Sequence, residues 1–285
     1  IAARFLVGMG VAACLMAPLT CYRRIFTPAA QLRANSWMLM TGSLGMLAST
    51  LPVQWLVPVW GWRGLFWAAA LLMVLAIALI AWRVPADDPA RPAGAAGAGA
   101  GYGPIMRHPV FVRSAPIGFF VYGGMIAVQT LWAGPLLMEA LGFTPIQAGN
   151  ILLLMNVGLI IGGPLWGAAA DRVFRTPKWC IAGGLLLLAV ITALMRALPP
   201  GTSALAAGAV FLAFGLASAS GLHVYAHIKA LVPKEMSGAA MSGTNFFTML
   251  GPAVFLQGIG IVMQGLYPDA SRGPEAFETA LLICA

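Results

Sequence analysis

Apolar stretches without a charged residue recur along the chain, and short polar or charged segments separate them. A helix needs about 20 apolar residues to cross the hydrocarbon core of a bilayer. Uncharged stretches close to that length predict membrane-spanning helices over residues 37–59, 65–82, 114–138, 146–170, 179–195, 203–222 and 239–263. The fold class that this pattern predicts is all-α, a polytopic transmembrane helix bundle.

Both ends of the chain carry further apolar stretches. Residues 1–20 form one that contains a single charge, Arg4, and residues 277–285 begin another. The chain has no initial Met, and it starts and stops within predicted helices. We interpret it as a fragment and expect no signal peptide in it.

Composition excludes the soluble classes. Hydrophobic residues make up 60% of the chain and charged residues 8%, whereas soluble domains carry about 25% charged residues. The formal net charge of +8 would suggest a nucleic-acid partner in a soluble protein. Here the cations lie in short loops, as the positive-inside rule describes, so the expected partner is the lipid bilayer and not nucleic acid.

Loop charge also predicts the orientation. Alternate loops divide the Lys and Arg residues into sets of twelve and three, with Arg4 inside a span, and the larger set marks the cytoplasmic side. Arg outnumbers Lys by thirteen to three, which suggests a GC-rich bacterium. The predicted location is therefore a bacterial inner membrane.

A segment rich in Gly, Ala and Pro divides the chain. Residues 84–112 lack the apolar surface needed to fold alone and are typical of a flexible tether. They separate residues 1–83 from residues 113–285. The two parts also resemble each other weakly at a shift of about 205 residues, as parallel repeats in transporters do.

One charged segment lies between two long apolar stretches. Gly167 is followed after three residues by Asp171 and Arg172, and Arg175 completes the pattern. This spacing resembles the signature loop of the major facilitator superfamily, a family of secondary transporters. Phe174 departs from it, because the family usually has Gly there. Alternatively, the basic residues only anchor a cytoplasmic loop.

The resemblance implies a fold of two pseudo-symmetric six-helix halves. Residues 1–83 would then be the last three helices of the first half, 84–112 a cytoplasmic linker, and 113–285 a second half truncated in its last helix. Helices one to three would be absent. The family also implies that the loop with Asp171 latches one half against the other during alternating access, and a monomeric protein is expected.

The resemblance extends to the start of the chain. Arg4 with Gly8 and Gly10 looks like the family's helix-four motif, which implies an Arg that faces the central cavity and binds an anionic group or takes part in proton movement. A charge in hydrocarbon is costly and is a functional candidate by default. Alternatively, Arg4 lies near a helix end and extends to the interface.

Polar residues within the predicted spans are the other candidates for solute binding or coupling. Tyr122 and Gln129 are seven residues apart and so lie within about 20° on one helical face, with Trp132 one turn further. Asn156, Asn245 and Thr248 are similar candidates in other spans. For each of them, a hydrogen bond between helices remains the alternative.

No residues suggest catalysis, a cofactor or a metal. His223 and His227 have helical i, i+4 spacing, but no third ligand accompanies them. The segment 215–223 contains Ser and His, yet it lacks a nucleophile-turn pattern. We therefore expect a protein that is not an enzyme.

The function that these observations favour is secondary active transport of a small organic solute by alternating access, with a co-transported proton as a further partner. Uptake is preferred, and Arg4 makes an anionic solute one option. The alternative is a proton-coupled drug or metabolite efflux pump. An intramembrane enzyme is a remote alternative, and a receptor or scaffold is a third.

Overall fold

The computed structural model contains only helices and their connections among the residues that it describes. These residues are 6–10, 14, 17–18, 21–22, 26–84, 102–233, 236–266 and 279. Arg4 and most of the predicted spans 1–20 and 277–285 lie outside them, and so does the side chain of Asp171. The chain divides into the units Ile1–Ser49 and Thr50–Ala285.

In the first unit, helix α3 spans Pro28–Ala48. Pro28 suits the first turn because that turn does not require its missing N–H. The helix ends at Ser49, whose backbone N–H donates to the oxygen of Gly45 at 3.0 Å. The Ser49 hydroxyl also donates to the oxygen of Met46 at 2.7 Å. The hydropathy pattern predicted one helix over the apolar stretch 37–59. This prediction was wrong, because α3 ends within that stretch.

Helix α4 spans Leu51–Arg83 and opens the second unit. It consists of two helical pieces that meet at Gly61, which has φ 65° and ψ 167°, a conformation that is open almost only to glycine. Residues 62–83 rise about 33 Å, enough to cross a bilayer alone. The predicted span 65–82 is confirmed, whereas the boundary near residue 50 was missed because Ser49 and Thr50 carry no charge.

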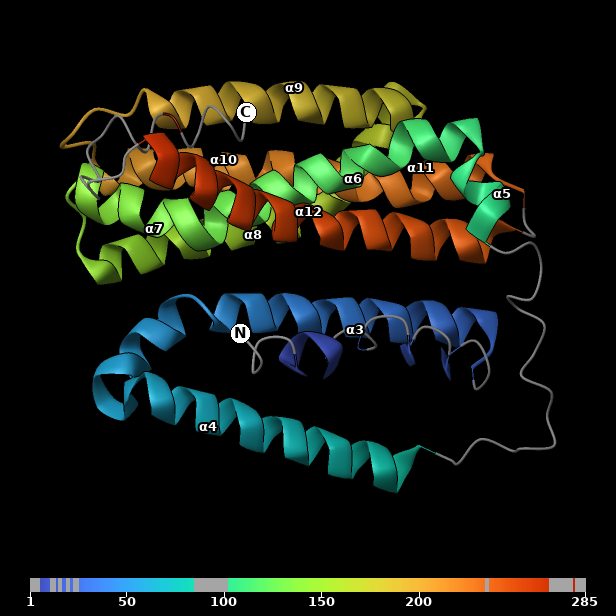
Figure 1. The fold of residues 1–285 in the computed structure, drawn as a ribbon, viewed down its shortest axis with the longest axis horizontal. Helices are drawn as coiled ribbons and strands as arrows, with labels where there is room; N and C mark the ends of the chain where they lie inside the picture. Colours follow the sequence, from blue (N-terminus) through green and yellow to red (C-terminus); the bar gives the residue numbers. More distant parts are fainter. Residues whose placement is uncertain are drawn as a thin grey trace. The chain divides into compact units, whose positions relative to one another are not determined.

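The rest of the second unit contains the other long helices (Figure 1). Several of them are built from segments of different helical pitch. The segments are α5 Tyr102–Met106, α6 Pro109–Ala127, η1 Val128–Trp132, α7 Ala133–Pro135, η2 Leu136–Ala140, α8 Pro145–Ala169, η3 Ala170–Phe174, α9 Pro177–Arg196, α10 Ala204–Ser218, η4 Ala219–Leu222, α11 His223–Leu231 and α12 Ser237–Leu266.

Six helices among the described residues are long and apolar enough to span a membrane. They are Pro52–Arg83, Pro109–Ala140, Pro145–Phe174, Pro177–Arg196, Ala204–Leu231 and Ser237–Leu266. Five of them correspond to the five complete spans predicted after residue 112, and the all-α fold class is confirmed. The predicted span 203–222 extends to Leu231, and His223 and His227 lie in its last part.

Local sequence signals explain where these helices start. Pro occupies the first turn of α6, α8 and α9. At the start of α8, the backbone N–H of Gln147 donates to the Thr144 hydroxyl at 3.3 Å, and the Thr144 N–H donates to Oε1 of Gln147 at 2.9 Å. This reciprocal pair is a capping box. The hydroxyl of Ser203 accepts from the N–H of Ala206 at the start of α10.

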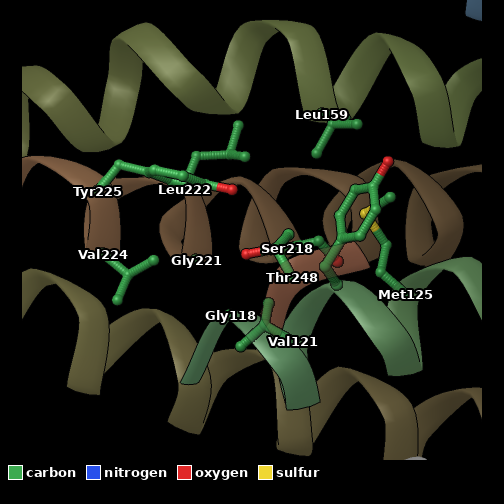
Figure 2. Close-up of a pocket in the computed structure, with 11 residues that line it drawn as sticks. Gly118, Val121, Met125, Leu159, Ser218, Gly221, Leu222, Val224, Tyr225 and Thr248 are labelled. Carbon is green, nitrogen blue, oxygen red and sulfur yellow. The ribbon is translucent and has the colours of Figure 1, made fainter. Parts of the chain in front are cut away.

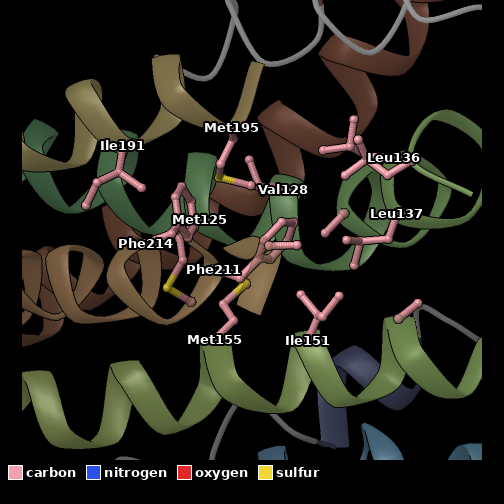
Figure 3. Close-up of a cluster of buried hydrophobic side chains, with 14 of the residues drawn as sticks. Met125, Val128, Leu136, Leu137, Ile151, Met155, Ile191, Met195, Phe211 and Phe214 are labelled. Atoms are coloured by element: carbon pink, nitrogen blue, oxygen red, sulfur yellow. The ribbon is translucent and has the colours of Figure 1, made fainter. Parts of the chain in front are cut away.

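Helix α10 packs against α8, and α12 packs against α6. The second unit contains a small hydrophobic cluster around Ile259 and Met263 and two larger ones. One, shown in Figure 3, contains Phe211 and Phe214 of α10 with Ile151 and Met155 of α8. The other joins Ile105 of the short helix α5 to Phe111, Ile181, Val224 and Ile228. A pocket lies in the same bundle and is lined from four of its helices.

Candidate functional site

The pocket contains about 400 Å³ of space that protein atoms do not fill, including space open to the surroundings. Figure 2 shows residues of α6, α8, α12 and the continuous segments α10, η4 and α11 around it. The lining residues are Gly118, Val121, Tyr122, Met125, Leu159, Ser218, Gly221, Leu222, Val224, Tyr225 and Thr248. The pocket is therefore formed by helices that are far apart in the sequence.

Hydroxyl groups on an apolar surface define the chemistry of the pocket. Its polar side chains are Tyr122, Ser218, Tyr225 and Thr248, and none of its lining residues carries a charge. The Ser218 hydroxyl donates to the oxygen of Phe214 at 2.8 Å. Because the Ser218 proton is used inside the protein, the Ser218 oxygen remains available to a solute as a hydrogen-bond acceptor.

Two hydrogen bonds orient the polar groups at the α12 side. The Thr248 hydroxyl donates to the oxygen of Thr244 at 2.9 Å, and the Tyr225 hydroxyl donates to Oδ1 of Asn245 at 3.3 Å. A small residue faces Thr248 from α6, because a Cβ added at Gly118 would lie only 2.6 Å from Oγ1 of Thr248. The close approach of α6 and α12 thus brings Thr248 into the pocket.

The structure brings some of the predicted site residues together. Tyr122 and Thr248 both line the pocket, and Asn245 is linked to it through Tyr225. Asn245 therefore orients a lining side chain and does not line the pocket itself. That any of these residues binds a solute stays a prediction.

The other predicted residues on this face form contacts between helices. Nε2 of Gln129 donates to Oδ1 of Asn156 at 2.8 Å, and Nδ2 of Asn156 donates to the oxygen of Leu152 at 3.2 Å. Asn156 is 1% exposed. Trp132 packs against the cluster of Figure 3. Because the π-helical turn η1 spans Val128–Trp132, the regular α-helical spacing that the sequence predicts from Tyr122 to Trp132 does not hold past Val128.

The predicted gating loop joins α8 to α9. Gly167 lies in α8, Arg172 lies in the π-helical turn η3, and Arg175 has the left-handed values φ 54° and ψ 6°. Both Arg172 and Arg175 are exposed. Since the side chain of Asp171 lies outside the described part of the chain, the latch assigned to it stays a prediction.

Two side chains pack close to this loop. Phe174, which departs from the family pattern, lies over Gly183 of α9. Its ring would be 3.6 Å from a Cβ added at that glycine. On the other side, Nε2 of His223 would lie 3.7 Å from a Cβ added at Gly167. No group of three potential metal ligands occurs among the described residues.

Sequence reasoning missed several residues of the pocket, notably Ser218 and Tyr225. A signal was present, because Ser218, Leu222 and Tyr225 have the i, i+4, i+7 spacing of one helical face. The hydropathy pattern placed the end of the span at residue 222. Tyr225 was consequently not among the candidates, although the helical spacing of His223 and His227 places it in the same helix.

The fold and pocket define a polytopic, all-α membrane protein, and comparison with known proteins identifies its family. The sequence model of the Major Facilitator Superfamily matches residues 1–256. The chain belongs to this family. It is also similar to the "Uncharacterized MFS-type transporter YbcL" of Bacillus subtilis (strain 168), with 24% identity over 205 residues.

That alignment covers 67% of this chain and 49% of the relative, so the chain spans about half the length of the curated relative that it matches. The resemblance drawn from Gly167, Asp171, Arg172 and Arg175 is confirmed by the family match. Both comparisons indicate a transporter rather than an enzyme.

Proposed function

We propose that the full-length protein is a secondary active transporter that moves a small organic solute across the membrane by alternating access. The observation that carries the proposal is a pocket formed between α6, α8, α10, η4, α11 and α12 in a member of the major facilitator superfamily. An apolar cavity with a few oriented polar groups is the usual form of a site for a small molecule. The Bacillus relative, whose name describes an MFS-type transporter, supports the same function.

The lining of the pocket favours a solute that is recognised by hydrogen bonds and apolar contacts. Tyr122, Tyr225 and Thr248 supply hydroxyl groups, and Met125 and Leu159 supply apolar surface. No charged side chain lines it. Recognition of an anionic solute would therefore depend on groups outside this pocket, and Arg4 is the candidate that the sequence supplies.

A second candidate is proton-coupled efflux of an amphipathic drug or metabolite. The specific observation in its favour is the apolar part of the lining, which suits a hydrophobic compound. In this case too, the solute is a small molecule and the proton is a further partner. The direction of transport with an imposed proton gradient separates uptake from efflux.

Solute flux into proteoliposomes that contain the full-length protein tests the proposal. The decisive variant is Thr248→Val, which removes one lining hydroxyl and keeps the side-chain shape. A net hydrogen bond of about 0.5–1.5 kcal/mol predicts an increase in KM of about 2–12-fold. Unchanged KM for every transported solute would contradict the assignment of this pocket.

A matched control is available in the helix that continues α6. The Thr130 hydroxyl donates to the oxygen of Ile126 at 2.7 Å, just as Thr248 bonds within its own helix, but Thr130 is not a lining residue. Thr130→Val should leave KM unchanged. An equal effect of both substitutions would show that lost helix hydrogen bonding, and not solute contact, causes the change.

For the setting of the protein, we propose a bacterial inner membrane and a monomer. The exposed Arg172, Arg175 and Lys178 at the end of α8 and the start of α9 support a cytoplasmic position for this loop. Labelling of a cysteine introduced at Arg175 from the cytoplasmic side, and not from the outside, is expected. Light scattering of the purified protein tests the monomer.

A further inference from the structure

A short 3-10 turn interrupts the long helix Ala204–Leu231. The turn η4, Ala219–Leu222, lies between α10 and α11, and it supplies Gly221 and Leu222 to the pocket. A 3-10 turn has three residues per turn, so that successive side chains point about 120° apart. Such a turn inside a helix often marks a functional hinge.

The turn contacts a different helix with each of three successive residues. A Cβ added at Gly162 of α8 would lie 2.7 Å from Cβ of Ala219, and one added at Gly184 of α9 would overlap the side chain of Ser220. One added at Gly221 would lie 2.5 Å from the side chain of Val121 in α6. The turn therefore joins the two helices that flank the predicted gating loop to a helix that lines the pocket.

Ser220 differs from the other hydroxyl residues of these helices. Ser218 and Thr248, like Thr192, donate to the carbonyl oxygen four residues earlier, which is the usual bond of Ser and Thr in a helix. The Ser220 hydroxyl is 0% exposed and has no partner among the described residues. A buried polar group of this kind requires an explanation.

The missing partner of Ser220 is already bonded to another side chain. Four residues before Ser220 lies Leu216, and its carbonyl oxygen accepts a hydrogen bond from Nε1 of Trp166 at 2.7 Å. Trp166 belongs to α8 and directly precedes Gly167, the first residue of the gating loop. Its own carbonyl oxygen accepts from Sγ of Cys180 in α9 at 3.4 Å.

We propose that Trp166 is a positioning residue for the pocket: its indole N–H occupies the Leu216 carbonyl and holds residues 219–222 in the 3-10 form, whereas Ser220 takes over that carbonyl when the turn becomes α-helical. The two donors thus define two arrangements of one element. Because the turn supplies Gly221 and Leu222 to the pocket, a movement of the gating loop that displaces Trp166 changes the pocket wall. The effect on transport rests on the proposed function, but the exchange of donors does not.

Hydrogen–deuterium exchange of the full-length protein in lipid nanodiscs tests the proposal without a solute. Trp166→Phe removes the indole donor and keeps an aromatic ring. The α-helical form of residues 219–222 then becomes more populated. Because 3-10 hydrogen bonds have poorer geometry than α-helical ones, amide exchange within residues 219–223 should become slower. The expected change is about threefold, which corresponds to the free energy of an average interhelical hydrogen bond in a membrane protein. Simple loss of packing would accelerate exchange instead.

A second variant distinguishes the switch from a local rearrangement. Ser220→Ala removes the competing donor, so the double variant with Trp166→Phe should lose the slowing of about threefold and return exchange of residues 219–223 to the wild-type rate. Trp179→Phe is the matched control, because Trp179 is 59% exposed on the neighbouring helix, and it should change nothing in this segment. Faster or unchanged exchange in Trp166→Phe, or no reversal in the double variant, would overturn the proposal.

The transport assay then connects the turn to the pocket. Trp166→Phe should change KM about threefold with little effect on the maximal rate, and the double variant should restore it. An unchanged KM combined with the expected exchange rates would overturn the positioning role. Absence of flux in the wild-type protein would instead refute the proposed function, while the exchange experiment would still decide whether the two donors compete.

Discussion

Helix α8 touches the backbone of α10 at Gly158, and a methyl group at this position measures how tightly the two helices are packed. A Cβ added there would overlap the carbonyl oxygen of Leu212 and would lie 3.0 Å from the backbone nitrogen of Leu216. Backbone atoms cannot rotate away, so the helices must separate. Overpacking of this kind costs typically about 1–3 kcal/mol.

Gly163 provides the matched control in the same helix, because a Cβ added there meets nothing within 4 Å. Both substitutions to Ala gain about 1 kcal/mol of helix propensity, and this gain cancels in their comparison. We therefore expect Gly158→Ala to be less stable than Gly163→Ala by about 1–3 kcal/mol, or about 2–12 °C in Tm.

Thermal unfolding of the detergent-solubilised protein, followed by intrinsic tryptophan fluorescence, measures this difference. Gly163→Ala should unfold at or above the wild-type temperature. A Gly158→Ala variant as stable as Gly163→Ala would refute the reasoning, since it would mean that α8 and α10 are not in backbone contact at this position.

Three further predictions concern single side chains. Gln129→Leu leaves the buried amide of Asn156 without its interhelical partner and should lower the free energy of unfolding by about 1–3 kcal/mol. The loss caused by Gln129→Leu should be smaller when Asn156 is already Leu. A double-mutant cycle on Tm measures this difference. Arg175→Gly should raise Tm, because a left-handed conformation costs a non-glycine residue about 1–2 kcal/mol. Arg172→Gly, at a helical position, should lower Tm. A change of the same sign in both variants would argue against backbone strain at Arg175 as the cause. Asp171→Asn should leave membrane insertion intact and weaken solute flux in proteoliposomes, and normal flux would refute the latch.

The site could be predicted from the sequence only in part. Tyr122 and Thr248 were expected because polar residues inside apolar spans are uncommon, and both line the pocket. Gln129 and Asn156 were expected for the same reason, but they bond to each other. A polar residue in a span needs a partner, and sequence alone does not reveal whether another helix or a solute provides it.

Other features became visible only through contacts between helices. Ser220 and Trp166 have no sequence spacing that relates them, because they lie on different helices. Their relation through the Leu216 carbonyl depends on the 3-10 turn and on the glycines that let α8 and α9 approach it. Such contacts depend on how each helix is rotated about its axis. Packing against neighbouring helices sets that rotation, and the hydropathy pattern of a single helix does not reveal it.

Hydropathy and motif spacing alone were enough for the all-α class, the five complete spans after residue 112 and the family, because these patterns are local properties of the chain. Tertiary structure decided the end of α3 at Ala48, the break at Gly61, the pairing of Gln129 with Asn156 and the set of residues around the pocket. These depend on how each helix is rotated and shifted against its neighbours, and that arrangement is settled by side-chain packing across the whole bundle.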